Sequence, residues 1–216
     1  MNGPSAGHPV PVPPGPVGVF AYWPNRITAI RFLGALALFA LLAWPPLAVP
    51  EPARTPMAIA FWLFVVIAAT DVLDGWLARR GNQVTAFGRI ADPFVDKVLV
   101  VGSLVFLTVM PWSRDFLPAW VVVAVVAREF LVTGIRGYVE SVGGQFPADR
   151  WGKLKMIVQC VAVGALLGRY AFPWGPQWVG PVEMLAHVAV WTTLVTTVGS
   201  GITYVAKARQ ILTPRP

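Results

Sequence analysis

The segment DVLDGWLARRGNQVTAFGRIADPFVD, residues 71–96, determines how the rest of the chain is interpreted. It holds four aspartates in a chain whose Asp and Glu residues total only ten. Asp71 and Asp74 are three residues apart and Asp92 and Asp96 are four apart, so on helices each pair lies on one face. Strongly apolar sequence flanks the segment on both sides, and carboxylates beside membrane-length apolar segments need partners, water or a metal ion. The segment therefore predicts a functional site at the edge of membrane-embedded helices.

Two such carboxylate pairs on neighbouring helices predict one cluster of oxygen atoms. Mg²⁺ and Mn²⁺ prefer oxygen ligands, and two ions about 3.5–4 Å apart are the usual arrangement for displacement at phosphorus. Gly75 and Gly88 have no side chain and allow a ligand close to the backbone, while the guanidinium of Arg79 suits phosphate. The alternative is a set of solvated turn carboxylates, but the apolar flanks favour a site. We predict two Mg²⁺ or Mn²⁺ ions, with ligands from Asp71, Asp74, Asp92 and Asp96.

The composition is that of a membrane protein. Of the 216 residues, 56% are hydrophobic and only 12% are charged, which is too apolar for an ordinary soluble domain. Residues 1–19 are rich in Pro and Gly and predict a disordered tail, and residues 20–212 predict a single membrane domain. Six apolar segments are each close to the ~20 residues that a membrane-spanning helix needs. We therefore predict an all-α, polytopic membrane protein with six transmembrane helices, at residues 27–48, 57–79, 93–111, 117–138, 153–172 and 182–206.

The basic residues predict the orientation of these helices. With six spans both termini lie on one side of the membrane, and twelve Lys and Arg residues lie on that side against three on the other. Because cytoplasmic loops carry the excess of positive charge, we predict that both termini and the aspartate segment are cytoplasmic, at the cell (inner) membrane. The net charge of +7 fits contact with anionic membrane lipids better than with nucleic acid, which we do not expect as a partner.

Charged residues also interrupt the later apolar segments. Arg128 and Glu129 lie inside the fourth, where a charge costs at least ~2.5 kcal/mol unless it is paired. Neighbouring residues on a helix do not face each other, so we expect a different partner for each. Arg136 lies two turns beyond Arg128 on the same face, and Lys153 and Lys155 open the fifth segment. Together these bases could hold an anionic phosphate; the alternative for Arg136 and the lysines is a topological role, with side chains reaching lipid headgroups.

Two further patterns resemble helix starts. Asn25 or Thr28, shortly after Pro24, could cap the first helix. Asp92 followed by Pro93 fits the cap and first turn of the third helix.

The aspartate segment also resembles a known family. The pattern Asp71-x-x-Asp74-Gly75-x-x-Ala78-Arg79, eight residues, Gly88-x-x-x-Asp92-x-x-x-Asp96 matches the signature of the CDP-alcohol phosphotransferases in all eight fixed positions. The resemblance extends from about Asn25 to the last helix. It is strongest to the bacterial phosphatidylglycerophosphate synthases, through NRIT (25–28), LARRGNQVTAFG (77–88), DPFVDKVLV (92–100), AREFLVTGIR (127–136) and GKLK (152–155).

The resemblance implies substrates and roles. The donor would be CDP-diacylglycerol, the acceptor sn-glycerol 3-phosphate, the products phosphatidylglycerophosphate and CMP, and the assembly a homodimer. Asp96 would be the catalytic residue, taking the proton of the acceptor hydroxyl as general base. The donor would be bound by Asn25, Thr28, Gly75, Ala78, Arg79, Thr85 and Gly88. With this acceptor, the basic residues singled out above from their positions, Arg128, Arg136, Lys153 and Lys155, would bind the acceptor phosphate.

Three alternatives stay open. The signature does not fix the acceptor, which could be phosphatidylglycerol, as in cardiolipin synthesis, or inositol phosphate. The same aspartates could form the ion path of a divalent-cation transporter, although they cluster near one membrane face and do not span the bilayer. A purely structural membrane anchor leaves the four carboxylates unexplained.

Overall fold

The computed structural model describes residues 22–81, 86–143 and 150–212, and the side chains of these residues except 71–81, 86, 89, 150 and 210–212. Over the described residues all regular secondary structure is helical, as predicted. The elements are α1 (Trp23–Leu42), the short 3₁₀ helix η2 (Pro45–Leu47), α2 (Arg54–Gly81), α3 (Ala86–Val109), α4 (Ala119–Ser141), α5 (Arg150–Ala171) and α6 (Pro176–Leu212).

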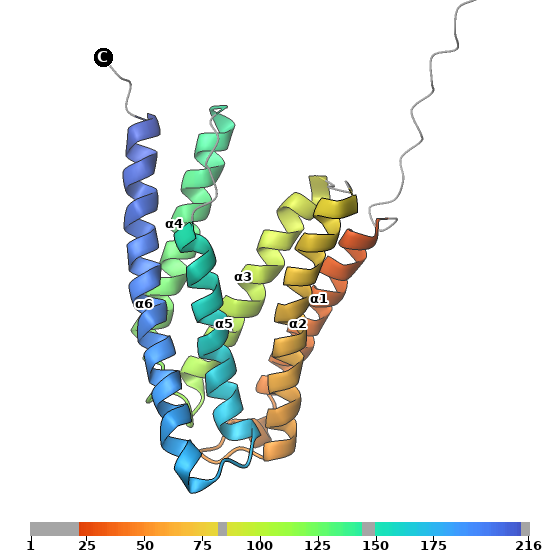
Figure 1. The fold of residues 1–216 in the computed structure, drawn as a ribbon, viewed down its shortest axis with the longest axis vertical. Helices are drawn as coiled ribbons and strands as arrows, with labels where there is room; N and C mark the ends of the chain where they lie inside the picture. The colour runs from red at the N-terminus through yellow and green to blue at the C-terminus, as the bar shows by residue number, and fades with distance from the viewer. Residues whose placement is uncertain (1–21, 82–85, 144–149, 213–216) are drawn as a thin grey trace, which may run out of the picture.

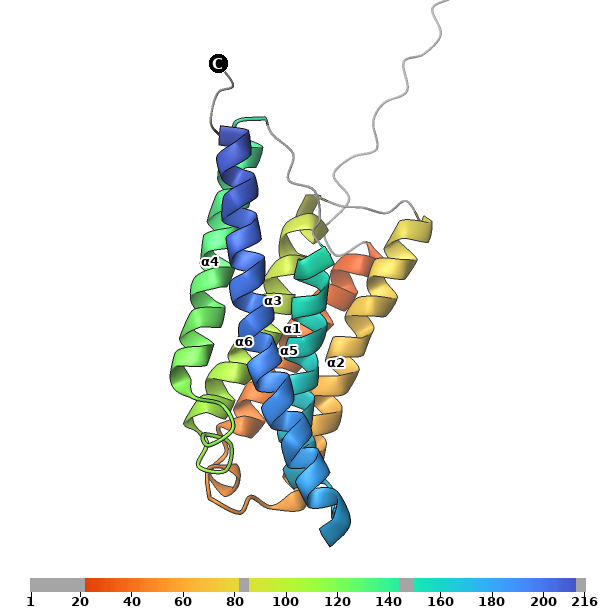
Figure 2. The same ribbon diagram turned by 60° about the vertical axis from the view of Figure 1, so that its left-hand side comes forward.

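The α-helices form one elongated bundle with alternating directions (Figures 1 and 2). α1 packs against α2 and α3, α6 packs against α4 and α5, and α5 also contacts α2 while α3 contacts α4. One end of the bundle, called here the aspartate end, holds the start of α1, the end of α2, the start of α3 and the end of α6 (Figure 1). The start of the first helix and the end of the last described helix therefore lie at the same end of the bundle.

The opposite end of the bundle is held by aromatic side chains. Trp112 donates its indole N–H to the carbonyl oxygen of Leu47 over 2.8 Å, and the hydroxyl of Tyr170 donates to the carbonyl oxygen of Trp112 over 2.9 Å. Between the two ends the ring of Phe39 on α1 lies against Gly102 of α3, where a Cβ atom would be 2.2 Å from the ring. A small residue at this contact allows the two backbones to approach each other. This contact packs α1 against α3 between the aspartates and the opposite end of the bundle.

Membrane character is distributed unevenly among the helices. Among the described residues three stretches are long and apolar enough to cross a membrane: Trp23–Leu42, Trp151–Ala171 and Pro176–Arg209. The apolar part of α2, Arg54–Thr70, is shorter. α3 and α4 are comparably long, but each carries several charged residues within its length. These charged residues include four predicted site residues, Asp92 and Asp96 on α3 and Arg128 and Arg136 on α4.

Both predicted helix starts are wrong. α1 begins at Trp23 and its N-cap residue, Tyr22, makes no side-chain cap, so neither Asn25 nor Thr28 caps the helix; both are buried inside it. α3 begins at Ala86, and Pro93 lies within the helix. Proline fixes φ near the helical value and removes one backbone hydrogen bond, so a helix that is packed on its neighbours can continue through it. The earlier start places Asp92 and Asp96 on one continuous helix.

Candidate active site

A face shared by α1 and α3 holds the second pair of predicted aspartates. The hydroxyl of Thr28 donates to Oδ1 of Asp92 over 2.5 Å, and the guanidinium Nη2 of Arg31 donates to Oδ1 of Asp96 over 2.5 Å. Because α1 and α3 both start at the aspartate end and run in the same direction, a step of three residues on α1 matches a step of four on α3. We call these four residues the aspartate face.

Arg31 was assigned no role from the sequence. Its side chain is only 3% exposed, although it carries a charge, and the carboxylate of Asp96 beside it is 22% exposed. A buried charge is costly unless it is paired, and here the pair joins two helices. The available signal was its position three residues after Thr28, which places both on one face of α1.

The first aspartate pair lies on α2 at a matching depth. Asp71 lies ten residues before the end of α2 at Gly81 and Asp96 ten residues after the start of α3 at Ala86, so each is about 15 Å along its helix from that end. α2 contacts both α1 and α3. The backbone thus brings all four aspartates to one end of the bundle.

Several predicted site residues lie outside the part of the chain whose side chains are described. These are Asp71, Asp74, Gly75, Ala78, Arg79 and Thr85. Gly88 is buried in the first turn of α3, and Asn25 is buried in α1.

Among the described side chains no group of three or more His, Cys, Asp or Glu could hold a metal ion, so the metal site stays a prediction. The two predicted ligands whose side chains are described, Asp92 and Asp96, are arranged as the predicted metal site requires. Asp92 and Asp96 lie one turn apart on α3, and a hydroxyl orients the carboxylate of Asp92 in the way that outer partners orient metal ligands.

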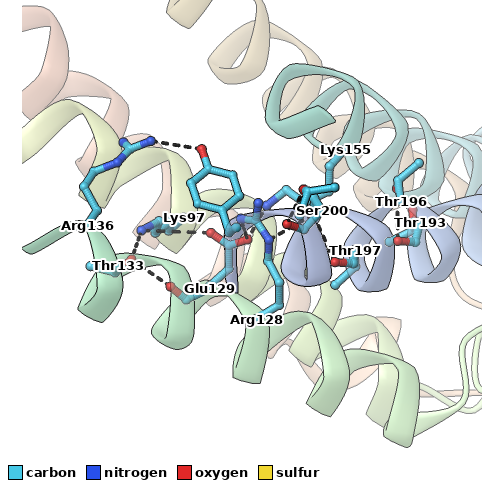
Figure 3. A network of polar contacts seen from close by, with 12 residues as sticks. Lys97, Arg128, Glu129, Thr133, Arg136, Lys155, Thr193, Thr196, Thr197 and Ser200 are labelled. Carbon is cyan, nitrogen blue, oxygen red and sulfur yellow. Dashed lines mark hydrogen bonds and ion pairs between the residues drawn. The ribbon is translucent and has the colours of Figure 1, made fainter. Parts of the chain in front are cut away.

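A second cluster, called here the basic network, consists of Lys97, Arg128, Glu129, Arg136 and Lys155 (Figure 3). Its centre is the carboxylate of Glu129 on α4. Oε1 of Glu129 accepts hydrogen bonds from Nη1 of Arg128, over 3.0 Å, and from Nζ of Lys155 on α5. Nζ of Lys97 on α3 lies 3.9 Å from Oε2 of Glu129. One carboxylate therefore connects cations from three helices.

Helix α6 supports the two arginines of the network. Nε of Arg128 donates to the hydroxyl of Ser200 over 3.1 Å, and its guanidinium lies 5.3 Å from the ring centre of Tyr204. Nη2 of Arg136 donates to the hydroxyl of the same Tyr204 over 3.2 Å (Figure 3). Arg128 and Arg136 therefore share a face, as predicted. The expectation that Arg128 and Glu129 do not meet is wrong, because the long arginine side chain reaches round the helix to its neighbour.

The network carries more positive than negative charge. Three cationic side chains contact the carboxylate of Glu129, and a fourth, that of Arg136, is joined to them through Tyr204. Of these five groups Arg128, Glu129 and Lys155 are buried. Nε of Arg136 is also buried and has no hydrogen-bond partner among the described residues. A low-dielectric site with excess positive charge favours an anion, and guanidinium groups suit phosphate.

The two lysines at the start of α5 differ in burial and in their contacts. Lys155 is 6% exposed and paired with Glu129, so it does not reach lipid headgroups, whereas Lys153 is exposed. Lys155 thus belongs with the arginines, and nothing described joins Lys153 to them.

These features define a helical membrane protein with two aspartates on a face shared by α1 and α3 and a cluster of basic side chains around Glu129. A model of the CDP-alcohol phosphatidyltransferase family matches residues 21–199, and the chain belongs to that family.

Curated relatives of the chain carry closely related names. It is 34% identical over 193 residues to the CDP-diacylglycerol–glycerol-3-phosphate 3-phosphatidyltransferase of Bacillus subtilis, covering 85% of this chain and 93% of the relative. It is 36% identical over 150 residues to a probable phosphatidylglycerophosphate synthase of Mycobacterium tuberculosis, covering 69% and 66%. A Haemophilus influenzae CDP-diacylglycerol–glycerol-3-phosphate 3-phosphatidyltransferase is 29% identical over 160 residues, covering 73% and 81%.

Proposed function

We infer that this protein transfers the phosphatidyl group of CDP-diacylglycerol to sn-glycerol 3-phosphate, forming phosphatidylglycerophosphate and CMP. The names of its relatives support both substrates. The observation that carries the choice of acceptor is the basic network, in which Lys97, Arg128 and Lys155 all contact the single carboxylate of Glu129, and Lys97 directly follows Asp96 on α3. An acceptor with its own phosphate suits that network better than a neutral alcohol does.

Helix α3 joins the two parts of the site. Asp96 contacts α1, while the next residue, Lys97, points to Thr133 and Glu129 of α4. Successive residues on a helix point in different directions, so α3 presents a carboxylate to one side and an ammonium group to the other. An acceptor whose phosphate lies at the basic network can therefore direct a hydroxyl towards Asp96.

The proposed reaction is a single displacement at phosphorus. The acceptor hydroxyl oxygen attacks the phosphorus that bears diacylglycerol, and Asp96 takes the hydroxyl proton. The bond from that phosphorus to the bridging oxygen breaks, and its electron pair leaves with CMP. Two Mg²⁺ or Mn²⁺ ions, held by Asp71, Asp74, Asp92 and Asp96, would supply charge neutralisation at the diphosphate. Thr28 orients Asp92 within that ligand set.

We propose six membrane spans, with both termini and the site on the cytoplasmic side of the cell membrane. The distribution of Lys and Arg supports this orientation, and the common end of the first and last described helices supports an even number of spans. Large apolar side chains exposed along several helices, among them Ile30, Leu33, Trp62 and Val195, support lipid contact. A homodimer is also proposed, on the family resemblance alone.

The test is CMP release from CDP-diacylglycerol by purified protein with Mg²⁺ or Mn²⁺. Glycerol 3-phosphate, glycerol, inositol phosphate and phosphatidylglycerol are compared as acceptors. We expect the highest kcat/KM with glycerol 3-phosphate and no release without added metal. Release that is fastest with another acceptor would change the assigned product, and divalent-cation flux in proteoliposomes without CMP release would favour a transporter.

A further inference from the structure

The contact between Arg31 and Asp96 has no assigned role in the reaction. Arg31 lies in the third turn of α1 and is almost completely buried, and its Nη2 atom is 2.5 Å from Oδ1 of Asp96. Asp96 is the residue to which the proposed function assigns the acceptor proton. We propose that Arg31 is a positioning residue, which holds the carboxylate of Asp96 in the orientation needed to meet the acceptor hydroxyl.

Two features show that this contact is built into the packing of α1 on α3. One turn earlier Thr28 makes the equivalent contact with Asp92, also at Oδ1, so successive turns of α1 hold successive carboxylates of α3. Further along, the ring of Phe39 on α1 packs against Gly102 of α3, so the two helices stay in contact beyond Asp96. The contact of Arg31 with Asp96 therefore lies within a packed interface between α1 and α3.

The chemistry of the side chain explains why an arginine is suited to this place. A guanidinium is planar and presents its donors in a fixed fork, whereas the ammonium group of a lysine is a point charge on a flexible stem. A general base must lie within hydrogen-bond reach of the proton it takes, and a misplacement of about 1 Å can lower a rate by roughly 10²-fold. Orientation of Asp96 is thus a property that Arg31 can supply and a lysine can supply only in part.

The proposal rests on the proposed function, and the test compares Arg31→Gln and Arg31→Lys with wild type. We expect Arg31→Gln to lower kcat by roughly 10- to 100-fold while the KM values of donor and acceptor stay within about threefold, because orientation and not binding is lost. Arg31→Lys should recover part of the loss. A rise in the KM of the donor at unchanged kcat would overturn the proposal, because Arg31 would then contact the substrate.

Arg169→Gln is the matched control. Arg169 forms another interhelical pair, with Glu183 of α6 over 2.9 Å, at the opposite end of the bundle. The Arg169→Gln variant shows how the loss of an interhelical ion pair affects folding without touching the site, and we expect its kcat to be near that of wild type. If Arg169→Gln lowers kcat as much as Arg31→Gln does, the effect is one of stability and the positioning role is wrong.

A double-mutant cycle with Asp96→Asn separates this proposal from the proposed function. If Arg31 acts through Asp96, Arg31→Gln lowers the slow single-turnover CMP release of Asp96→Asn no further. An independent, multiplied loss overturns the positioning role and leaves the general base in place. Wild-type turnover by Asp96→Asn would instead refute the general base, and the positioning role with it.

Discussion

The aspartate face and the basic network both place charged side chains within helices of one bundle, but negative charge predominates in the first and positive charge in the second. On the aspartate face Thr28 and Arg31 of α1 hold two carboxylates of α3. In the basic network a single carboxylate, that of Glu129, holds cations from α3, α4 and α5. Arg31 thus pairs with one of two carboxylates, while Glu129 pairs with three cations. The first region suits cations and the second suits anions, so donor activation and acceptor binding should be separable by mutation.

The largest effect is expected at the aspartate face. Asp96→Asn keeps the size of the side chain but cannot take a proton at neutral pH, and loss of a general base typically lowers the rate 10²- to 10⁴-fold. CMP release at saturating substrates and metal measures this. Asp115→Asn, which changes a fully exposed aspartate at the opposite end, is the control and should leave the rate unchanged. A wild-type rate for Asp96→Asn would remove the catalytic role from this face.

The next effect is expected in the basic network. Arg128→Gln removes a buried guanidinium that contacts Glu129, Ser200 and Tyr204. A hydrogen bond to a charged group is worth about 1.5–3 kcal/mol, so the KM of glycerol 3-phosphate should rise by roughly one to two decades. The KM of the donor should change little, and Arg128→Lys should recover only part of the loss. If Arg128→Gln raised the KM of CDP-diacylglycerol and left the KM of glycerol 3-phosphate unchanged, Arg128 would bind the CDP part of the donor.

Glu129→Gln tests whether geometry or net charge governs the network. The change makes the site more positive, so a purely electrostatic account predicts a lower KM for glycerol 3-phosphate. If Glu129 instead fixes Arg128 and Lys155, the KM should rise, by roughly tenfold, since one charge-assisted contact is lost at each partner. Acceptor titration at saturating donor decides between the two, and a fall in KM would show that Glu129 does not position these cations.

The smallest effect distinguishes the two lysines of α5. Lys155→Gln should raise the KM of the acceptor by several-fold, up to roughly tenfold, because a buried cation of the network is lost. Lys153→Gln should change it by less than about threefold, as expected for an exposed charge. The same acceptor titration serves for both. Equal effects of the two substitutions would show that Lys153 belongs to the site as well.

The sequence predicts some of this architecture and not the rest, for physical reasons. Apolar length predicts the helices, and residue spacing predicts that Arg128 and Arg136 share a face, because both are properties of one helix. The pairing of Arg31 with Asp96 depends on how α1 lies against α3, which no local pattern fixes. The start of α3 was wrongly placed because the Asp92–Pro93 pattern is typical of a helix start, while packing on α1 carries the helix through the proline.

The most direct test of the account measures both KM values and the metal requirement in Asp92→Asn and Arg128→Gln, beside wild type, in one detergent preparation. The account predicts that Asp92→Asn raises the KM of CDP-diacylglycerol and the Mg²⁺ or Mn²⁺ concentration needed for half-maximal rate, with the acceptor KM unchanged. Arg128→Gln should raise only the KM of glycerol 3-phosphate. If both variants raise the same KM, the two regions do not divide donor and acceptor between them, and the account is wrong.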